Sequence, residues 1–170
     1  MLRQIQLLTG AMMSSLVVLA VVVAVALPDD DRFAAPPLWL LAAQFGTGAA
    51  LFALIETIGY RTVAVDPETD QQSAMTQAFA AFQSGTIVRF ALSEVVAVGS
   101  LAAAFVIDDG GVTGYATGAV VSLALMGYHA WPWSRPVDKT VARLERAGGR
   151  SHLREGLGLP HKPGGAIQEL

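Results

Sequence analysis

Residues 5–27 read IQLLTGAMMSSLVVLAVVVAVAL, and no charged side chain interrupts them. An α-helix rises about 1.5 Å per residue, so about 20 apolar residues cross a hydrocarbon core of about 30 Å. Three more apolar runs of comparable length follow along the chain. The sequence therefore predicts four transmembrane helices, with spans near residues 5–27, 37–59, 85–107 and 112–131.

The predicted fold is an all-α integral membrane four-helix bundle over residues 1–134, built as two helical hairpins. The turn at residues 108–111 is so short that the last two spans must be antiparallel neighbours. Residues 46–60 also align with residues 114–128, glycine on glycine and tyrosine on tyrosine. This match reflects either duplication of one hairpin or chance within apolar sequence.

The first span also allows a second interpretation, as a cleaved secretory signal. Arg3 would then be the basic n-region, and residues 24–26 would be the small-residue cleavage site. The apolar stretch is longer than the usual h-region of about 7–15 residues, which favours a retained helix. Cleavage would leave three spans with the same tail.

Composition excludes several classes of function. Hydrophobic residues make up 53% of the chain and charged residues only 15%, against roughly 25% charged in an average soluble domain. The chain has no cysteine, which excludes disulfides, thiol nucleophiles and thiolate metal sites. No phosphate-binding loop or nucleophile–base pair stands out, and the three histidines are scattered. We expect no enzyme activity, no metal, no cofactor and no nucleic-acid partner.

Basic residues set the predicted orientation, because Lys and Arg are retained on the cytoplasmic side. Nine of the eleven lie on one side, in Arg3, Arg61 and the segment after residue 131. Arg32 lies on the other side, and Arg89 lies inside a span. Both termini are therefore predicted to be cytoplasmic. The preference for Arg over Lys and for Ala, Val and Gly favours a bacterial source and hence the cell inner membrane.

Small residues recur at four-residue spacing on two predicted helices. The second carries Ala42, Gly46 and Ala50, and the fourth carries Gly114, Gly118 and Ser122. Such faces let helix backbones approach closely in lipid. They serve either packing within the chain or contact with a membrane protein partner or a second copy, as in a homo-oligomer.

The segment after the fourth span divides into two parts. Residues 135–149 form a predicted cytoplasmic helix whose apolar face carries Val137, Val141 and Leu144. The basic side chains Lys139, Arg143 and Arg146 cover the rest, a pattern typical of a helix lying on anionic lipid. An ordinary solvated helix is the alternative. Residues 150–170, with several prolines and glycines, are predicted to be a flexible tail.

Three charges inside the spans are the candidate functional residues, because ionisable groups at membrane depth are costly and usually paired or functional. Glu56 and Arg89 both lie about one turn from the cytoplasmic end, where they are predicted to form an ion pair. Glu94 lies about 12 Å into the core. Its apolar surroundings favour a neutral carboxyl that donates a hydrogen bond, with Ser14 and Ser15 as acceptors. The site is either structural or a proton-binding site.

The stretch Ala91-Leu92-Ser93-Glu94, followed by residues 95–105, resembles the carboxylate-bearing helix of the proteolipid, or c, subunits of rotary ATP synthases. Two tandem hairpins are similar to the doubled proteolipids of the vacuolar type. The resemblance covers about one helix in four, and the dense glycine pattern and polar loop of those subunits are missing. It implies an ion-carrying role for Glu94 alone.

The functional prediction is a small accessory or interaction subunit of a larger membrane complex, with the lipid bilayer as its surroundings. The alternative is a proteolipid-like protein that handles protons or ions through Glu94.

Overall fold

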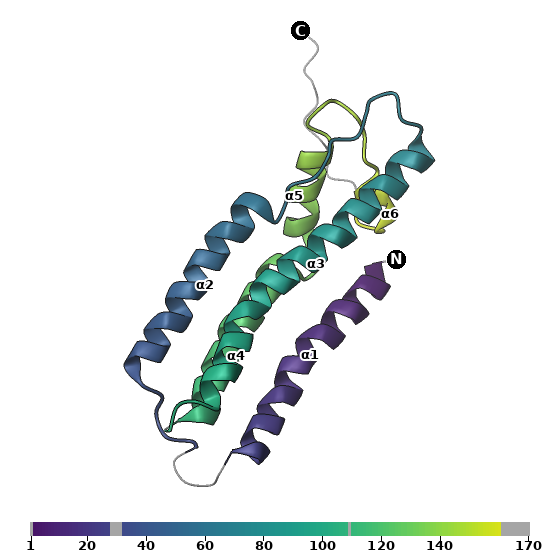
Figure 1. Ribbon diagram of the computed structural model, residues 1–170. Helices are drawn as coiled ribbons and strands as arrows, with labels where there is room; N and C mark the ends of the chain where they lie inside the picture. Colours follow the sequence, from purple (N-terminus) through teal and green to yellow (C-terminus); the bar gives the residue numbers. More distant parts are fainter. Residues whose placement is uncertain (1, 28–31, 109, 161–170) are drawn as a thin grey trace.

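The protein is all-α in the computed structural model, which describes residues 2–27, 32–108 and 110–160. Four long helices run side by side (Figure 1), and these are α1 (Leu2–Ala26), α2 (Leu38–Ile58), α3 (Gln71–Ala104) and α4 (Gly111–His129). Two short helices follow, α5 (Ser134–Leu144) and α6 (Leu153–Gly156). No strand occurs in the described ranges. The predicted all-α class is confirmed.

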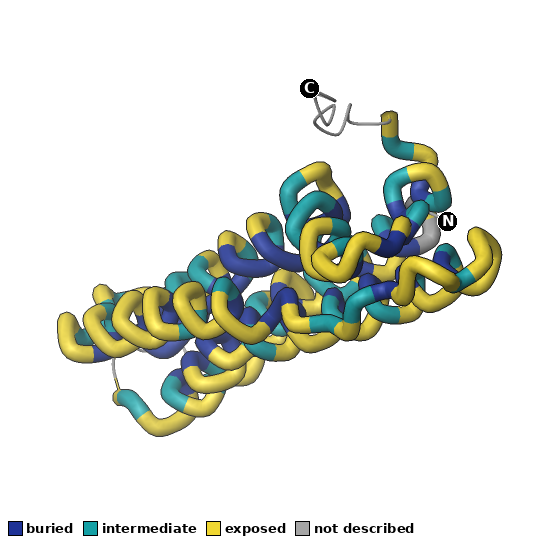
Figure 2. The backbone as a smooth tube through the Cα atoms, turned by 90° about the horizontal axis from the view of Figure 1, so that it is seen from above, coloured by how far each residue is buried: buried dark blue, intermediate teal, exposed yellow. Residues whose placement is uncertain are grey.

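Three helices are long and apolar enough to cross a membrane, namely α1 from Ile5, α2 and α3. The helix α4, which matches the fourth predicted span, is not among them. Its position explains why: ten of its 19 residues are buried, against four of 21 in α2. A helix that faces protein on most sides needs less apolar surface than one that faces lipid. Exposed positions gather on the outward sides of the bundle (Figure 2).

The helices do not pair as two separate hairpins. α3 and α4 form the predicted antiparallel hairpin and share the most extensive contact in the fold. α1 and α2 instead pack mainly on α4 and α3. The hydroxyl of Tyr115 in α4 illustrates this, because it donates to the Leu16 carbonyl of α1 at 2.9 Å. α4 is therefore the central helix that holds the other three together.

A buried glutamine joins three of the long helices. The Gln44 side chain of α2 donates to the Ser100 hydroxyl of α3 at 2.9 Å and to the Gly114 carbonyl of α4 at 2.7 Å. Its amide oxygen accepts from the Thr117 hydroxyl at 2.8 Å. Gly118 makes room for this group, since a Cβ there would lie 1.9 Å from Ser100 Oγ. The small-residue face of the fourth helix thus serves packing within the chain.

The third long helix begins well before its predicted span. Asp70 caps it by accepting the Ser73 backbone N–H at 3.1 Å, so α3 has 34 residues and a length of about 51 Å. This exceeds a hydrocarbon core of about 30 Å. The first third of α3 therefore projects beyond the level at which the other long helices end.

The projecting part of α3 carries a small cap made of α5, α6 and the segment before α3 (Figure 1). We call these packed elements the cap. The predicted apolar face of α5 points inward, with Val137 and Leu144 fully buried. Leu153 and Leu157 are buried too, so residues 150–160 are packed and not a flexible tail. Residues 161–170 lie outside the described residues. The cap corrects the prediction that α5 rests its apolar face on lipid, because that face is occupied by the protein's own core.

The substitution Gly118→Ala tests the packing at Gln44. The new methyl group would overlap Ser100, and overpacking of this kind costs about 1–3 kcal/mol. Gly127→Ala is the matched control in the same helix, because nothing lies within 4 Å of its Cβ position. We expect the first variant to unfold at a lower temperature in detergent and the control to match or exceed the unsubstituted protein. Equal losses in both would contradict the packing.

Candidate functional site

A fully buried arginine marks the end of the bundle next to the cap. Arg89 of α3 is 1% exposed. Its guanidinium donates to the His129 carbonyl at 2.8 Å, to the Gly59 carbonyl at 3.0 Å and to the Thr86 hydroxyl at 2.9 Å. Those two carbonyls end α4 and α2. Arg89 therefore joins the carboxyl ends of two helices to the middle of a third.

Helix ends explain how this cation is stabilised, since no carboxylate pairs with it in the described part of the chain. The last carbonyls of a helix lack partners within the helix and carry the negative end of its dipole. The guanidinium also lies 4.6 Å from the centre of the Tyr60 ring and 5.7 Å from that of Phe82, in cation–π geometry. Gly85 leaves the space for it, because a Cβ there would lie 3.0 Å from Arg89 Nη1.

The predicted ion pair between Glu56 and Arg89 is wrong. Glu56 instead binds two cations of α5, Arg135 at 2.6 Å and Lys139. The sequence argument missed these partners because it assigned α5 to the lipid surface and not to the bundle. The Glu56 contacts tie α5 to the end of α2.

A buried histidine, His129, contacts both Glu56 and Arg89. His129 is fully buried, and its Nδ1 lies 3.2 Å from the Tyr60 hydroxyl and 3.6 Å from Glu56 Oε1. Burial raises the pKa of the Tyr60 phenol, so this hydroxyl keeps its proton and is available to donate near neutral pH. We call Glu56, Tyr60, Arg89, His129, Arg135 and Lys139 the polar cluster.

Glu94 lies apart from the polar cluster. It is half-buried on α3, between the buried residues Phe90 and Ala97 and beside the exposed residues Val95 and Val98. No hydrogen bond or ion pair joins it to another residue in the described part of the chain. The Tyr115 hydroxyl donates to the Leu16 carbonyl and not to Glu94.

The two predicted acceptors do not reach Glu94. Ser14 and Ser15 are exposed, and their hydroxyls donate to carbonyls of their own helix, at Ala11 and Met12, each at 2.7 Å. The candidate ion-binding set of Glu94, Ser14 and Ser15 is therefore not assembled.

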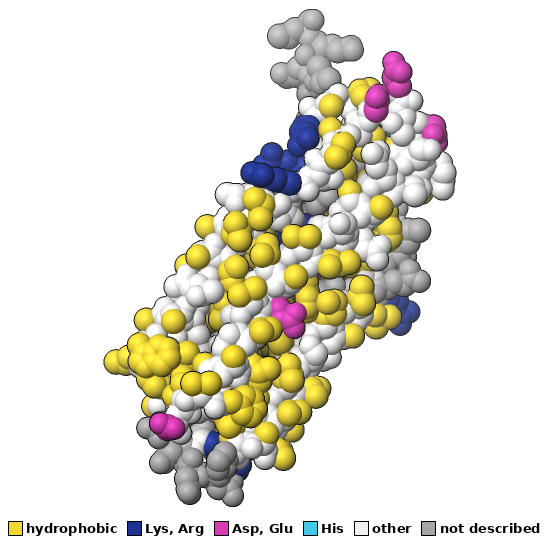
Figure 3. Space-filling model, viewed as in Figure 1, with side chains coloured by type: hydrophobic (Ala, Val, Ile, Leu, Met, Phe, Trp, Pro, Cys, Tyr) yellow, Lys and Arg dark blue, Asp and Glu magenta, His cyan; other side chains and the backbone are white. Residues whose placement is uncertain are grey.

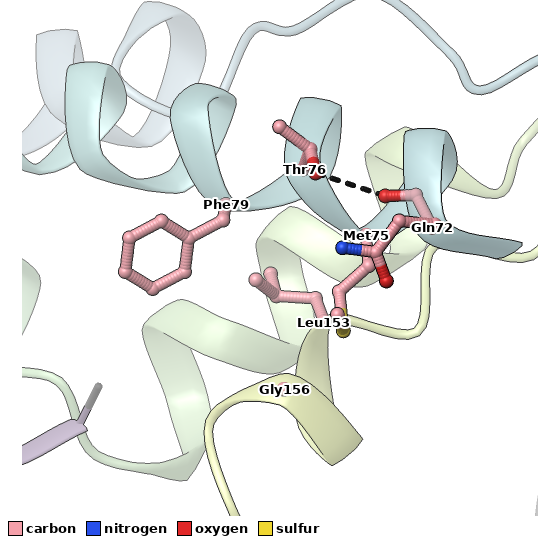
Figure 4. A pocket seen from close by; sticks show the side chains of 6 residues that line it. All are labelled: Gln72, Met75, Thr76, Phe79, Leu153 and Gly156. Atoms are coloured by element: carbon pink, nitrogen blue, oxygen red, sulfur yellow. Dashed lines mark hydrogen bonds between the residues drawn. The ribbon is translucent and has the colours of Figure 1, made fainter.

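The cap contains a small pocket between α3 and α6 (Figure 4). Its volume is about 120 Å³, well below the roughly 300–1,000 Å³ typical of ligand sites. Its lining is mostly apolar: Gln72, Met75, Thr76, Phe79, Leu153 and Gly156. Across the described ranges, no three His, Cys, Asp or Glu side chains gather as metal ligands would. The polar cluster and Glu94 are the features that invite a functional explanation.

Comparison with protein-family models, with curated proteins and with solved structures gives no significant match.

The substitution Arg89→Ala tests the role of the buried guanidinium. It leaves two buried carbonyls without their donor, and we expect the free energy of unfolding to fall by about 3 kcal/mol. The exposed Arg143 on α5 is the control, since Arg143→Ala should change stability by no more than about 0.5 kcal/mol. Denaturation in detergent measures both.

Adding Glu56→Gln to Arg89→Ala distinguishes the observed contacts from the predicted pair. Because Glu56 does not bind Arg89, the second substitution should restore none of the lost stability. Recovery in the double variant would mean that the two side chains are coupled after all.

Proposed function

We propose that this chain is a four-span protein of a bacterial inner membrane, with both termini in the cytoplasm, and that it acts as an accessory subunit. In this proposal it receives a transmembrane helix of a larger membrane complex beside Glu94. The three apolar helices, and α4 packed among them, support the membrane location. Lys and Arg gathered near the meeting of α2 and α5 support the orientation (Figure 3).

The observation that carries the proposal is the unpaired state of Glu94. Two other polar side chains of the long helices bond across helices: Gln44 joins α2 to α3 and α4, and Ser122 accepts the Ala97 N–H at 2.9 Å. Glu94 makes no such bond in the described part of the chain. An ionised side chain at the centre of a membrane helix costs about 2.5 kcal/mol or more. A donor supplied from outside the chain would remove that cost.

The surroundings of Glu94 fit a helix as that donor's source. An apolar face of small and medium-sized side chains lies exposed beside it, made of Ala91, Val95 and Val98. Gly99 adds a further open position, since nothing lies within 4 Å of its Cβ position. A helix that carries Arg, Lys or a neutral hydrogen-bond donor at this depth would pack on the apolar face and bind the carboxyl.

A proton-carrying role for Glu94 is the second proposal, and the resemblance to proteolipid subunits supports it. Ion carriers in membranes pass protons between polar groups. The nearest predicted relay groups, Ser14 and Ser15, bond to their own helix instead. The interaction proposal therefore accounts for more of the contacts.

A photo-crosslinking side chain at Val98 tests the interaction proposal. We expect one discrete membrane protein to be captured, with capture lost in Glu94→Ala and retained in Glu94→Gln, which still forms hydrogen bonds. The same crosslinker at Phe45, an exposed position on α2, is the control. Capture that is absent at Val98, equal at Phe45 or indifferent to Glu94→Ala would overturn the proposal.

Proton flux into vesicles separates the two proposals. In vesicles that contain the purified chain and hold a pH gradient, the unsubstituted protein should dissipate the gradient no faster than the Glu94→Gln variant. Faster dissipation that disappears with Glu94→Gln would instead favour the proton carrier.

The orientation is tested with single cysteines placed in this cysteine-free chain. Asp108 and Glu68 are both exposed and lie at opposite ends of the bundle. An impermeant thiol reagent added outside intact cells should label a cysteine at 108 and not one at 68. The reverse pattern would place the cap outside.

A further inference from the structure

We propose that the end of the bundle where α2 and α4 meet α5 binds the headgroup of an anionic phospholipid. The headgroup site consists of Tyr128, Trp133, Arg135 and Lys139. This inference requires that the chain lies in a bilayer, but it does not depend on a partner at Glu94.

The charges around the headgroup site are unbalanced. Arg135 and Lys139 share one carboxylate, that of Glu56. Arg89 lies behind them across the Tyr60 ring, 4.6 Å from its centre, and has no carboxylate partner in the described part of the chain. Three cations thus face one carboxylate, which leaves a net positive charge. The Arg135 and Lys139 side chains are 27% and 35% exposed, so a ligand can reach them from outside.

Two aromatic side chains place these cations at the level of lipid headgroups. Trp133 is 44% exposed, and its indole N–H donates to the Tyr128 carbonyl at 3.2 Å. Tyr128 is partly exposed beside it, with ring centres 6.1 Å apart. Trp and Tyr with one apolar and one polar edge are enriched where the hydrocarbon core meets the headgroups. The phosphate of a lipid whose chains lie along α2 and α4 would reach Arg135 at this level.

The geometry of Arg135 suits a phosphate. Its guanidinium carbon lies 4.0 Å from the centre of the Tyr128 ring, and its Nη2 binds Glu56 at 2.6 Å. These two contacts fix the plane of the guanidinium before any ligand arrives. A planar, ordered guanidinium beside an ammonium group is a common arrangement for binding phosphodiester oxygens.

The packing of α5 distinguishes this site from a general basic surface. Val137 and Leu144 anchor α5 in the cap, so the helix does not roll onto the membrane. Arg143 lies eight residues after Arg135, about 12 Å further along the helix, and is exposed away from the bundle end. Of the three lipid contacts predicted from the sequence, only Lys139 belongs to the site. Arg143 near the end of α5 and Arg146 just after it are both exposed and therefore provide a matched control.

The experiment compares lipid retention by the full chain in detergent. The protein is mixed with phosphatidylglycerol or with phosphatidylcholine of the same acyl chains, and bound lipid is counted by native mass spectrometry. We expect preferential retention of phosphatidylglycerol. The double variant Arg135→Gln with Lys139→Gln should lower that preference by at least about fivefold, whereas Arg143→Gln with Arg146→Gln should change it little.

A third variant, Glu56→Gln, separates lipid binding from a purely structural role. It frees both cations from their carboxylate, so retention of phosphatidylglycerol should rise even though the link between α2 and α5 is weakened. Because this change has the opposite sign, loss of folding in the Arg135 and Lys139 variant would not hide the result.

Three outcomes of the lipid-retention experiment would overturn the proposal. The first is equal retention of the two lipids, and the second is equal loss in the two double variants. The third is displacement of phosphatidylglycerol by millimolar inorganic phosphate, which would assign the site to a soluble anion.

A brominated phosphatidylglycerol should also quench tryptophan fluorescence more than brominated phosphatidylcholine does, and Trp133→Phe should remove that difference. Equal quenching, or a difference that persists in Trp133→Phe, would count against the site.

Discussion

The fold depends on a single guanidinium, that of Arg89, which donates hydrogen bonds to the carboxyl ends of two helices at once. Arg89 supplies donors to the carbonyl ends of α2 and α4, groups that would otherwise remain unpaired inside the protein. Gly59 and His129 are buried, and arginine offers enough donors in one plane to satisfy both carbonyls. The ends of α2 and α4 are thereby fixed relative to α3. Glu56, His129 and the cations of α5 are arranged around that fixed point.

A second buried side chain, that of Gln44, joins three helices deeper in the bundle. Gln44 uses both donors and its oxygen within one contact among three helices, and Gly118 provides the space. Hydrogen bonds of this kind add about 0.6 kcal/mol each on average in a membrane, so their main effect is to specify which faces meet. Glu94, in contrast to Gln44, makes no hydrogen bond in the described part of the chain, and it lies at the edge of the buried face and not inside it.

Sequence patterns predicted the positions of α1, α2 and α4 well, because apolar length is a one-dimensional property. The predicted span began at residue 85, whereas α3 begins at Gln71, where Asp70 caps it, because residues 71–84 are too polar to count towards an apolar run. The partners of Glu56 and Arg89 were missed for a different reason. Depth along two helices placed them at one level, but only the folded path of α5 brings Arg135 and Lys139 to the carboxylate, while backbone carbonyls satisfy Arg89. A sequence gives no sign of which backbone groups will need a donor.

The length of α3 gives the molecule a continuous connection between the cap and the four-helix bundle. The helix runs through 34 residues without a proline, from the cap to the far end of the bundle. A rod of about 51 Å that tilts by about 5° moves its tip by about 4 Å. α5 and α6 pack on one end of this rod, and α4 packs along the other. The cap and Glu94 thus lie on one continuous helix, so the position of one is fixed relative to the other.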